Sequence, residues 1–217
     1  MNKTILAIGA HYDDCPFGIP GILLQAVRRH YRVVILNIIG DYSAWAPVKG
    51  RAEQLVETSI SHARERGMEM KFLKYASMQF EANAETKQAV SDVVAEVKPE
   101  VAFMLWHQDR HPDHEVAAAI CKAALRGVRR IYAYDNGPGH TIGFEPNTFV
   151  DITTEWQSAM EWLGGLMAFV HKRPFNPQLL DGALATKETL ARYRGLTCGV
   201  KYAEAVWASR AYPTEIF

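Results

Sequence analysis

The sequence lacks several features that would place it outside the ordinary globular proteins. It has only three cysteines in 217 residues, Cys15, Cys121 and Cys198. They lie far apart and are odd in number, which argues against a disulfide framework and favours a reducing, cytoplasmic setting. No apolar run approaches the length that crosses a bilayer, so no transmembrane segment is expected. The apolar residues behind Lys3 are too few for a secretory signal.

An excess of charge of either sign is also missing. Lys and Arg together number 24, as do Asp and Glu, so net charge gives no reason to expect nucleic acid or an anionic membrane as a partner. The chain instead combines 48% hydrophobic with 22% charged residues, an ordinary balance for a globular protein. Since no repeat, low-complexity segment or linker is evident, residues 1–217 are expected to form a single domain.

Apolar strands alternate with helical segments along most of the chain. Runs typical of strands cover residues 4–9, 32–39, 70–73, 101–106, 130–134 and 149–152. Helical patterns cover residues 17–30, 49–67, 85–98, 114–126, 155–171 and 183–193. This alternation predicts right-handed crossovers and an α/β fold, a Rossmann-like, mostly parallel sheet with helices on both faces.

Two clusters of polar side chains follow predicted strands. His11-Tyr12-Asp13-Asp14 comes after the first strand, and residues 107–114, with the sequence HQDRHPDH, come after the strand 101–106. Ligands of an open parallel sheet bind at the carboxyl ends of its strands. Two imidazoles and a carboxylate suit a divalent metal, most often zinc, with one position left for water. A bound cation would also let two adjacent aspartates stay ionised.

Each cluster alone has a plainer explanation. An Asp-Asp pair behind a strand is usually a helix N-cap followed by an acidic residue in the first turn. The second cluster could equally be a turn into a helix, with Asp113 as its cap. Two such clusters at strand-to-helix connections of one sheet favour a joint site.

The clusters resemble the two motifs of the LmbE-like, or PIG-L-type, zinc-dependent N-deacetylases, A-H-P-D-D-E and H-P-D-H. The chain has AHYDDC at residues 10–15 and HPDH at residues 111–114. Further stretches that match the family in the same order are RAE at 51–53, FVDIT at 149–153, YRGL at 193–196 and YAEA at 202–205. The resemblance therefore extends along nearly the whole chain.

The resemblance implies that His11, Asp14 and His114 bind Zn²⁺, with another divalent metal as an alternative. It implies that Asp13 is the general base, accepting a proton from water that the metal has made more acidic. His111 would stabilise the oxyanion or protonate the leaving amine.

The resemblance also implies the reaction, which is removal of an N-acetyl group from an N-acetylglucosamine-type amino sugar or its small-molecule conjugate. Asp113 is interpreted as a catalytic-site partner that orients the ring of His111, alongside its alternative role as a helix cap. Relatives that assemble into trimers or hexamers make a homo-oligomer an expectation.

Two positions depart from the family pattern. Tyr12 replaces a proline, which loosens the backbone, and Cys15 replaces a glutamate. The Cys15 thiol either competes as a metal ligand or packs in the first helical turn, and packing is favoured. Two alternatives stay open: a member of the fold that binds metal or carbohydrate without turnover, which these departures make conceivable, and a metal-dependent hydrolase of a different bond.

Four further residues are candidates for substrate binding. By resemblance Arg51 would bind a substrate hydroxyl or phosphate; otherwise it pairs along its own helix. Asp109 and Arg110 flank the second motif and would orient His111 or contact substrate, or pair with each other. His140 lies in the glycine- and proline-rich stretch 135–146, a candidate lid, where it would reach over the pocket or stay exposed.

Overall fold

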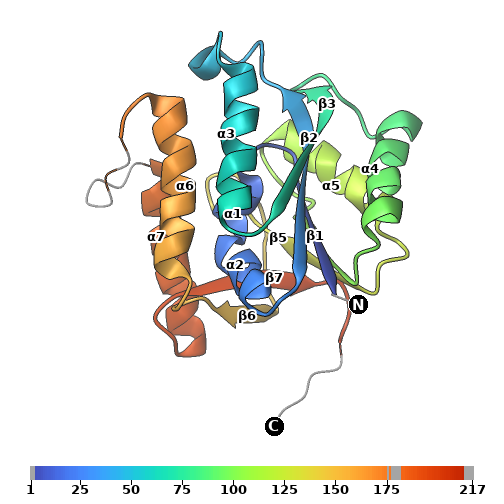
Figure 1. The fold of residues 1–217 in the computed structure, drawn as a ribbon. Helices are drawn as coiled ribbons and strands as arrows, with labels where there is room; N and C mark the ends of the chain where they lie inside the picture. Colours follow the sequence, from blue (N-terminus) through green and yellow to red (C-terminus); the bar gives the residue numbers. More distant parts are fainter. Residues whose placement is uncertain (1–2, 175, 177–181, 213–217) are drawn as a thin grey trace.

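The computed structural model describes residues 3–174, 176 and 182–212, and its strands form one sheet (Figure 1). The strand order is β3-β2-β1-β4-β5-β7-β6. Its strands are β1 Thr4–Gly9, β2 Arg32–Asp41, β3 Glu69–Ala76, β4 Val101–Leu105, β5 Arg130–Tyr134, β6 Thr148–Asp151 and β7 Ala203–Ala208. The first five run parallel, β7 is antiparallel to β5, and β6 is antiparallel to β7. The predicted mostly parallel α/β sheet is confirmed.

Helices cover both faces of the sheet, as predicted. Figure 1 shows α4 and α5 on one face, and α1, α2, α3, α6 and α7 on the other. Their bounds are α1 Asp14–Gly18, α2 Pro20–Arg28, α3 Ala52–Glu65, α4 Ala84–Val97, α5 Pro112–Ala124, α6 Trp156–His171 and α7 Gly182–Cys198, with a short 3₁₀ helix η1 at Ala46–Val48. Every residue of β1 is buried, because parallel strands between two helical layers face apolar side chains on both sides. Among the described residues, no helix has the length and apolar character that a bilayer crossing requires.

The single helix predicted over residues 17–30 is two helices in the structure. The break lies at Ile19, whose φ of −138° is not helical, and α2 begins at Pro20. A proline disfavours helical backbone at the residue before it and has no N–H to donate. The break leaves the N–H groups of Gly21 and Ile22 to donate to the two carboxylate oxygens of Glu204, over 3.0 and 2.8 Å.

Strand β7 was missed because a fully buried glutamate interrupts its apolar pattern. Glu204 lies in the middle of β7 with no exposed surface, where sequence reasoning expects a glutamate to face solvent. Besides the two N–H groups of α2, its carboxylate accepts a hydrogen bond from Nζ of Lys187 on α7, over 2.7 Å. The buried pair therefore ties α7 to β7 and to the start of α2.

Replacing Lys187 by Met is expected to lower the free energy of unfolding by about 3 kcal/mol, because the Glu204 carboxylate is left buried without a counter-charge. Urea unfolding followed by circular dichroism measures the change. The matched control is Lys74→Met, since Lys74 is 80% exposed and forms only a surface pair with Glu85. Equal midpoints for the two variants would contradict the prediction.

The sheet topology places both sequence motifs at one crevice. Strands β1 and β4 are neighbours in the sheet, and the order of the chain reverses between them. At such a switch point the loops that leave the two strands diverge to opposite faces and open a crevice at their carboxyl ends. The first motif follows β1 and the second follows β4, so the topology brings them together.

Candidate metal centre

The first motif folds back over the end of β1 to place Asp14. One oxygen of Asp14, Oδ2, accepts hydrogen bonds from the backbone N–H groups of Ala10 and His11, each over 2.7 Å. A Cβ atom on Gly9 would lie 2.8 Å from Cβ of Asp14, so only glycine leaves room for this approach. Asp13 occupies the N-cap position of α1, yet its side chain makes no capping hydrogen bond. The twin aspartates are therefore not a simple helix cap.

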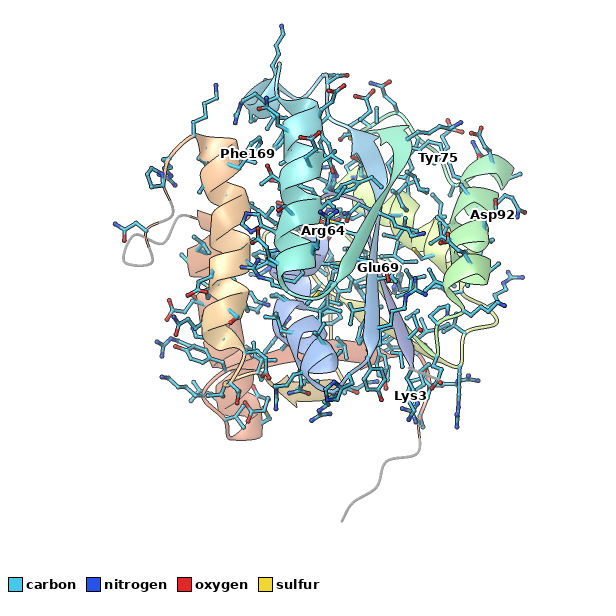
Figure 2. The ribbon with its side chains drawn as sticks, viewed as in Figure 1. Lys3, Arg64, Glu69, Tyr75, Asp92 and Phe169 are labelled. Carbon is cyan, nitrogen blue, oxygen red and sulfur yellow. The ribbon has the colours of Figure 1, made fainter. Side chains whose placement is uncertain are left out.

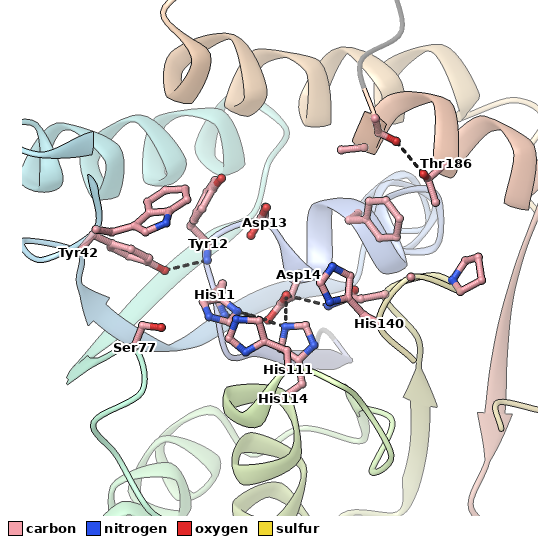
Figure 3. A pocket seen from close by; sticks show the side chains of 17 residues that line it. His11, Tyr12, Asp13, Asp14, Tyr42, Ser77, His111, His114, His140 and Thr186 are labelled. Carbon is pink, nitrogen blue, oxygen red and sulfur yellow. Dashed lines mark hydrogen bonds and ion pairs between the residues drawn. The ribbon is translucent and has the colours of Figure 1, made fainter. Parts of the chain in front are cut away.

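Two overlapping groups of potential metal ligands lie in the crevice, His11-Asp14-His114 and His11-His111-Asp113, and the first is the predicted set. Nδ1 of His11 lies 3.2 Å from Nε2 of His114, and that same Nε2 lies 3.2 Å from Oδ1 of Asp14. One ligand atom from each of the three residues lies within 4.8 Å of the others. Figure 3 shows these side chains together at the floor of a pocket. The structure thus brings together the three residues that the sequence analysis selected as a ligand set.

Each of the two histidines has a carboxylate behind it. Nε2 of His11 lies 3.1 Å from Oδ2 of Asp113, and Nδ1 of His114 lies 3.2 Å from Oδ2 of Asp109. A neutral imidazole that keeps its proton on the carboxylate side presents a lone pair on its other nitrogen, the arrangement usual for metal-binding histidines. Two such lone pairs would face each other across 3.2 Å beside a carboxylate. This donor set fits a divalent cation.

The ionisation of the three residues shows how strongly the site favours positive charge. Burial alone lowers the pKa of His11 and His114, but hydrogen bonds and charges of the surrounding aspartates raise it to about 9 and about 10. Burial alone raises the pKa of Asp14, but the two histidines hold it well below its usual value. A metal ion that binds here must displace protons from the histidines, so its affinity falls as the pH falls.

Asp13 faces the same cavity without joining the ligand group. It lines the cavity beside Asp14, is partly exposed, and points away from the three converging side chains (Figure 3). Burial and the charge of Asp14 together raise the pKa of Asp13 to about 6. At neutral pH its carboxylate is mostly ionised and basic enough to accept a proton.

His111 has a defined tautomer. Its Nδ1 accepts a hydrogen bond from the backbone N–H of Asp113 over 3.2 Å, so a neutral ring carries its proton on Nε2. Within the part of the chain that the structure describes, Nε2 has no hydrogen-bond partner, and His111 lines the cavity. Burial and the neighbouring His11 and His114 lower the pKa of His111, so the neutral, donating form prevails at neutral pH.

The structure corrects the interpretation of Asp113. Its carboxylate does not orient His111, whose Nδ1 is 3.9 Å away, but holds His11 instead. It also accepts hydrogen bonds from Oγ of Ser77 over 2.6 Å and from the N–H of Met78 over 2.9 Å. Helix α5 begins at Pro112 with His111 as its N-cap, so Asp113 is not the cap either. Its position in the first turn points the side chain back to the end of β3.

The cavity above the ligand group has a volume of about 560 Å³ and an aromatic wall. The rings of Tyr12, Tyr42 and Trp45 pack against one another with centroids 5.7 to 6.2 Å apart. Figure 3 shows Tyr12 and Tyr42 on one side of Asp13, with His140 and Thr186 on the other. Asp13 therefore lies between an aromatic side of the cavity and a side that holds His140 and Thr186.

The aromatic wall depends on the tyrosine that stands in place of the family proline. The backbone N–H of Tyr12, which a proline would lack, donates to the hydroxyl of Tyr42 over 2.9 Å. Both residues are buried. The loosened backbone expected at this position is thus held by a hydrogen bond that the substitution itself makes available.

Replacing Tyr42 by Phe is expected to lower the free energy of unfolding by about 2 kcal/mol, because the buried N–H of Tyr12 loses its acceptor. In a Tyr12→Pro background the same change should cost less than half as much, since that N–H no longer exists. Chemical unfolding of the four proteins of this cycle measures the difference. An equal cost of Tyr42→Phe in both backgrounds would refute the role of this hydrogen bond.

Cys15 packs in the first helical turn, as the sequence analysis favoured. It has no exposed surface, and its Sγ lies 3.3 Å from the hydroxyl of Tyr134, which donates to the carbonyl of Ile8. Burial raises the pKa of the thiol. Among the described residues Cys15 belongs to no group of potential metal ligands.

The structure does not bring Arg51 to this cavity. Its guanidinium donates to the carbonyls of Phe169 and Pro47, each over 3.0 Å, and lies 4.7 Å from the centroid of the Phe169 ring. Phe169 lies on the side of α6 that faces α3 (Figure 2). Arg51 lines a separate hollow between the end of β2 and α3. It therefore links α6 to the segment before α3, and does not pair along its own helix.

The other three candidates differ in their placement. Asp109 lies behind His114, where its carboxylate also accepts from the N–H of His111 over 2.8 Å. Arg110 has an exposed side chain and does not line the cavity. His140 lines the cavity at its exposed rim, with its ring centroid 6.0 Å from that of His114. Of the four candidates only His140 can touch a ligand in the cavity.

Sequence reasoning missed Asn136, which also lines the cavity. Its Nδ2 donates to Oδ1 of Asp14 over 2.7 Å. Asn136 follows β5, the strand next to β4, so the rule that the carboxyl ends of parallel strands share one edge could have found it. No recognisable motif in the sequence marks Asn136.

The pattern of the family described as PIG-L, GlcNAc-PI de-N-acetylase, matches residues 6–125, which hold both motifs. The chain belongs to the PIG-L family. The match extends from within β1 to the end of α5 and therefore includes the carboxyl ends of both strands at the switch point.

Relatives of this PIG-L family member carry two kinds of activity in their names. A 4-oxalmesaconate hydratase of Pseudomonas putida is 24% identical over 71% of this chain and 69% of its own. Two solved structures share the fold. The conserved protein TT1542 of Thermus thermophilus has a TM-score of 0.83 and 20% identity over 98% and 97% of the two chains. N,N'-diacetylchitobiose deacetylase of Pyrococcus horikoshii has a TM-score of 0.77 and 18% identity, covering 95% of this chain and 83% of that one.

Proposed function

We propose that the protein is a metal-dependent N-deacetylase acting on an N-acetylglucosamine-type amino sugar or its conjugate. The observation that carries this proposal is the pairing of a three-residue ligand group with Asp13, a carboxylate that faces the same cavity outside that group. A site that only binds metal has no need of such a base. The family match supports amide hydrolysis.

In this proposal His11, Asp14 and His114 hold the ion, zinc in the first place. When bound, such an ion supplies Lewis acidity, which makes a water molecule more acidic and polarises a carbonyl oxygen. Asp14 stays an anion because its two oxygens accept N–H donors and face the histidines. Asp13 takes the proton from the attacking water, since it is ionised at neutral pH and lies beside the ligand group.

His111 supplies the donor for the charge that develops on the substrate. Its Nε2–H, without a partner among the described residues, can donate to the carbonyl oxygen as that atom becomes negative. The proton that Asp13 has taken can then pass to the amine nitrogen, which makes it a leaving group. His11 keeps its orientation throughout because Asp113 is fixed by Ser77 and by the N–H of Met78.

The hydratase relative makes hydration of a carbon–carbon double bond the second candidate, because an activated water and a base serve both reactions. The substrate in the name of that relative, 4-oxalmesaconate, is a carboxylate. The described cavity lining includes Asp13 and aromatic rings but no Lys or Arg, and the sequence has neither residue outside the described ranges. Besides the ion and the histidines around it, the described lining offers no counter-charge to a substrate with several carboxylates, and its aromatic side chains and Asp13 favour a neutral amide.

The test is a parallel assay of the zinc-loaded protein. N-acetylglucosamine conjugates are offered in one arm, with acetate and free amine measured, and 4-oxalmesaconate in the other, with its absorbance followed. We expect acetate and amine in equal amounts, and one metal ion per chain. Hydration without acetate release would overturn the proposal in favour of the second candidate. Metal binding without turnover of either substrate would also overturn it, in favour of a binding protein.

A further inference from the structure

We propose that residues 135–141, the segment after β5, form a clamp that positions two of the three proposed metal ligands. Asn136 and Thr141 would be positioning residues that set the affinity for the ion. This inference rests on the metal centre of the proposed function. It deepens that function by assigning roles to two residues outside both sequence motifs and outside the 6–125 match.

The first arm of the clamp reaches Asp14. Nδ2 of Asn136 donates to Oδ1 of Asp14 over 2.7 Å, and both residues are more than nine-tenths buried. Because the carboxylate accepts only, the amide NH₂ must face it, and the network itself assigns the orientation of Asn136. The other oxygen of Asp14 already takes the N–H groups of Ala10 and His11. Asn136 therefore provides the third hydrogen bond that fixes the carboxylate plane.

The second arm reaches His114 through Asp109. The hydroxyl of Thr141 donates to Oδ2 of Asp109 over 3.1 Å, and that oxygen lies 3.2 Å from Nδ1 of His114. The same hydroxyl accepts a hydrogen bond from the backbone N–H of Asn136 over 3.0 Å. One side chain thus couples the two arms, so a shift in either arm would displace both ligands.

The clamp makes contacts at both of its ends. Backbone hydrogen bonds join Arg110 N–H to the carbonyl of His140 over 2.9 Å and Ile142 N–H to the carbonyl of Gln108 over 3.0 Å. At the start, Asp135 forms a buried ion pair with Arg194 of α7. The clamp is thereby attached to the second motif and to α7.

The turn inside the clamp needs glycine at one position. Gly137 has a φ of +84°, in the left-handed region, and a Cβ there would lie 3.3 Å from both Phe17 and Thr186. This turn directs Asn136 down to Asp14 while returning the chain to Thr141. The segment therefore connects the two ligands to α7 through one turn.

Mutation of a residue that hydrogen-bonds to a metal ligand typically lowers the metal affinity 10- to 100-fold. We expect Asn136→Leu, which removes the amide at similar size, to raise the Kd for Zn²⁺ about 30-fold, within that range. Thr141→Val, which removes only the hydroxyl, should raise it about 10-fold. Thr141→Ser keeps the hydroxyl and should bind as the wild type does.

The experiment is calorimetric titration of the metal-free proteins with Zn²⁺, together with the visible absorption of the Co²⁺ forms, which reports ligand geometry without any turnover. The matched control is Thr186→Val, because Thr186 lines the same cavity but its hydroxyl donates only to the carbonyl of Gly182. Thermal unfolding of the metal-free variants separates loss of affinity from loss of fold. Wild-type Kd values and Co²⁺ spectra in folded Asn136→Leu and Thr141→Val would overturn the clamp, even if the wild type proves to be a deacetylase. A wild type that binds no Zn²⁺ would overturn the proposed function as well.

Discussion

Replacing Asp13 by Asn is expected to lower kcat by about 10³-fold, because the change removes the proton acceptor and hardly alters size. The metal should stay bound, since Asp13 lies outside the ligand group. Steady-state acetate release and metal content per chain, measured on the same preparation, test both halves of the prediction.

Two results would contradict this role of Asp13. If Asp13→Asn retains more than a tenth of the wild-type kcat, another group accepts the proton. If the variant loses its metal, Asp13 belongs to the ligand group, contrary to the geometry in which Asp14, and not Asp13, faces the two histidines. Burial and the charge of Asp14 raise the pKa of Asp13, whereas the two histidines hold the pKa of Asp14 well below its usual value.

Replacing His114 by Ala is expected to abolish both metal binding and acetate release. The residue is 4% exposed, and its Nε2 is the atom that approaches both His11 and Asp14. Its loss also leaves Asp109 with a buried carboxylate and no histidine to face. Treatment of the wild type with a chelator should have the same effect on activity, and added Zn²⁺ should restore the wild type alone.

The matched control for this prediction is His140→Ala. His140 lines the same cavity at an exposed position and belongs to no described group of potential ligands. The His140→Ala variant should keep the metal. A hundredfold excess of Zn²⁺ over its Kd should raise the free energy of unfolding of this variant by about 2.7 kcal/mol. If His114→Ala gains the same stabilisation from Zn²⁺ as His140→Ala does, the ion binds elsewhere.

Local patterns in the sequence determined the architecture and the position of the site. Strands alternating with helices imply a parallel sheet, and two polar clusters that each follow a strand must lie at the same edge of it. Within the first motif, the spacing from His11 to Asp14 is short enough that the turn after β1 alone sets their approach. The sheet architecture and the His11–Asp14 spacing depend on residues close together in the chain, so they can be predicted from the sequence alone.

Only the tertiary structure decided which partners hold the site in place. Asn136 meets Asp14 across 122 positions of sequence, and Asp113 turns to His11 rather than to the adjacent His111. The hydrogen bond from Tyr12 to Tyr42 and the burial of Glu204 in β7 likewise depend on how separate elements pack. The physical reason is that a polar side chain gives no local sign of its distant partner, because the desolvation that makes the pairing necessary arises only once the chain has folded.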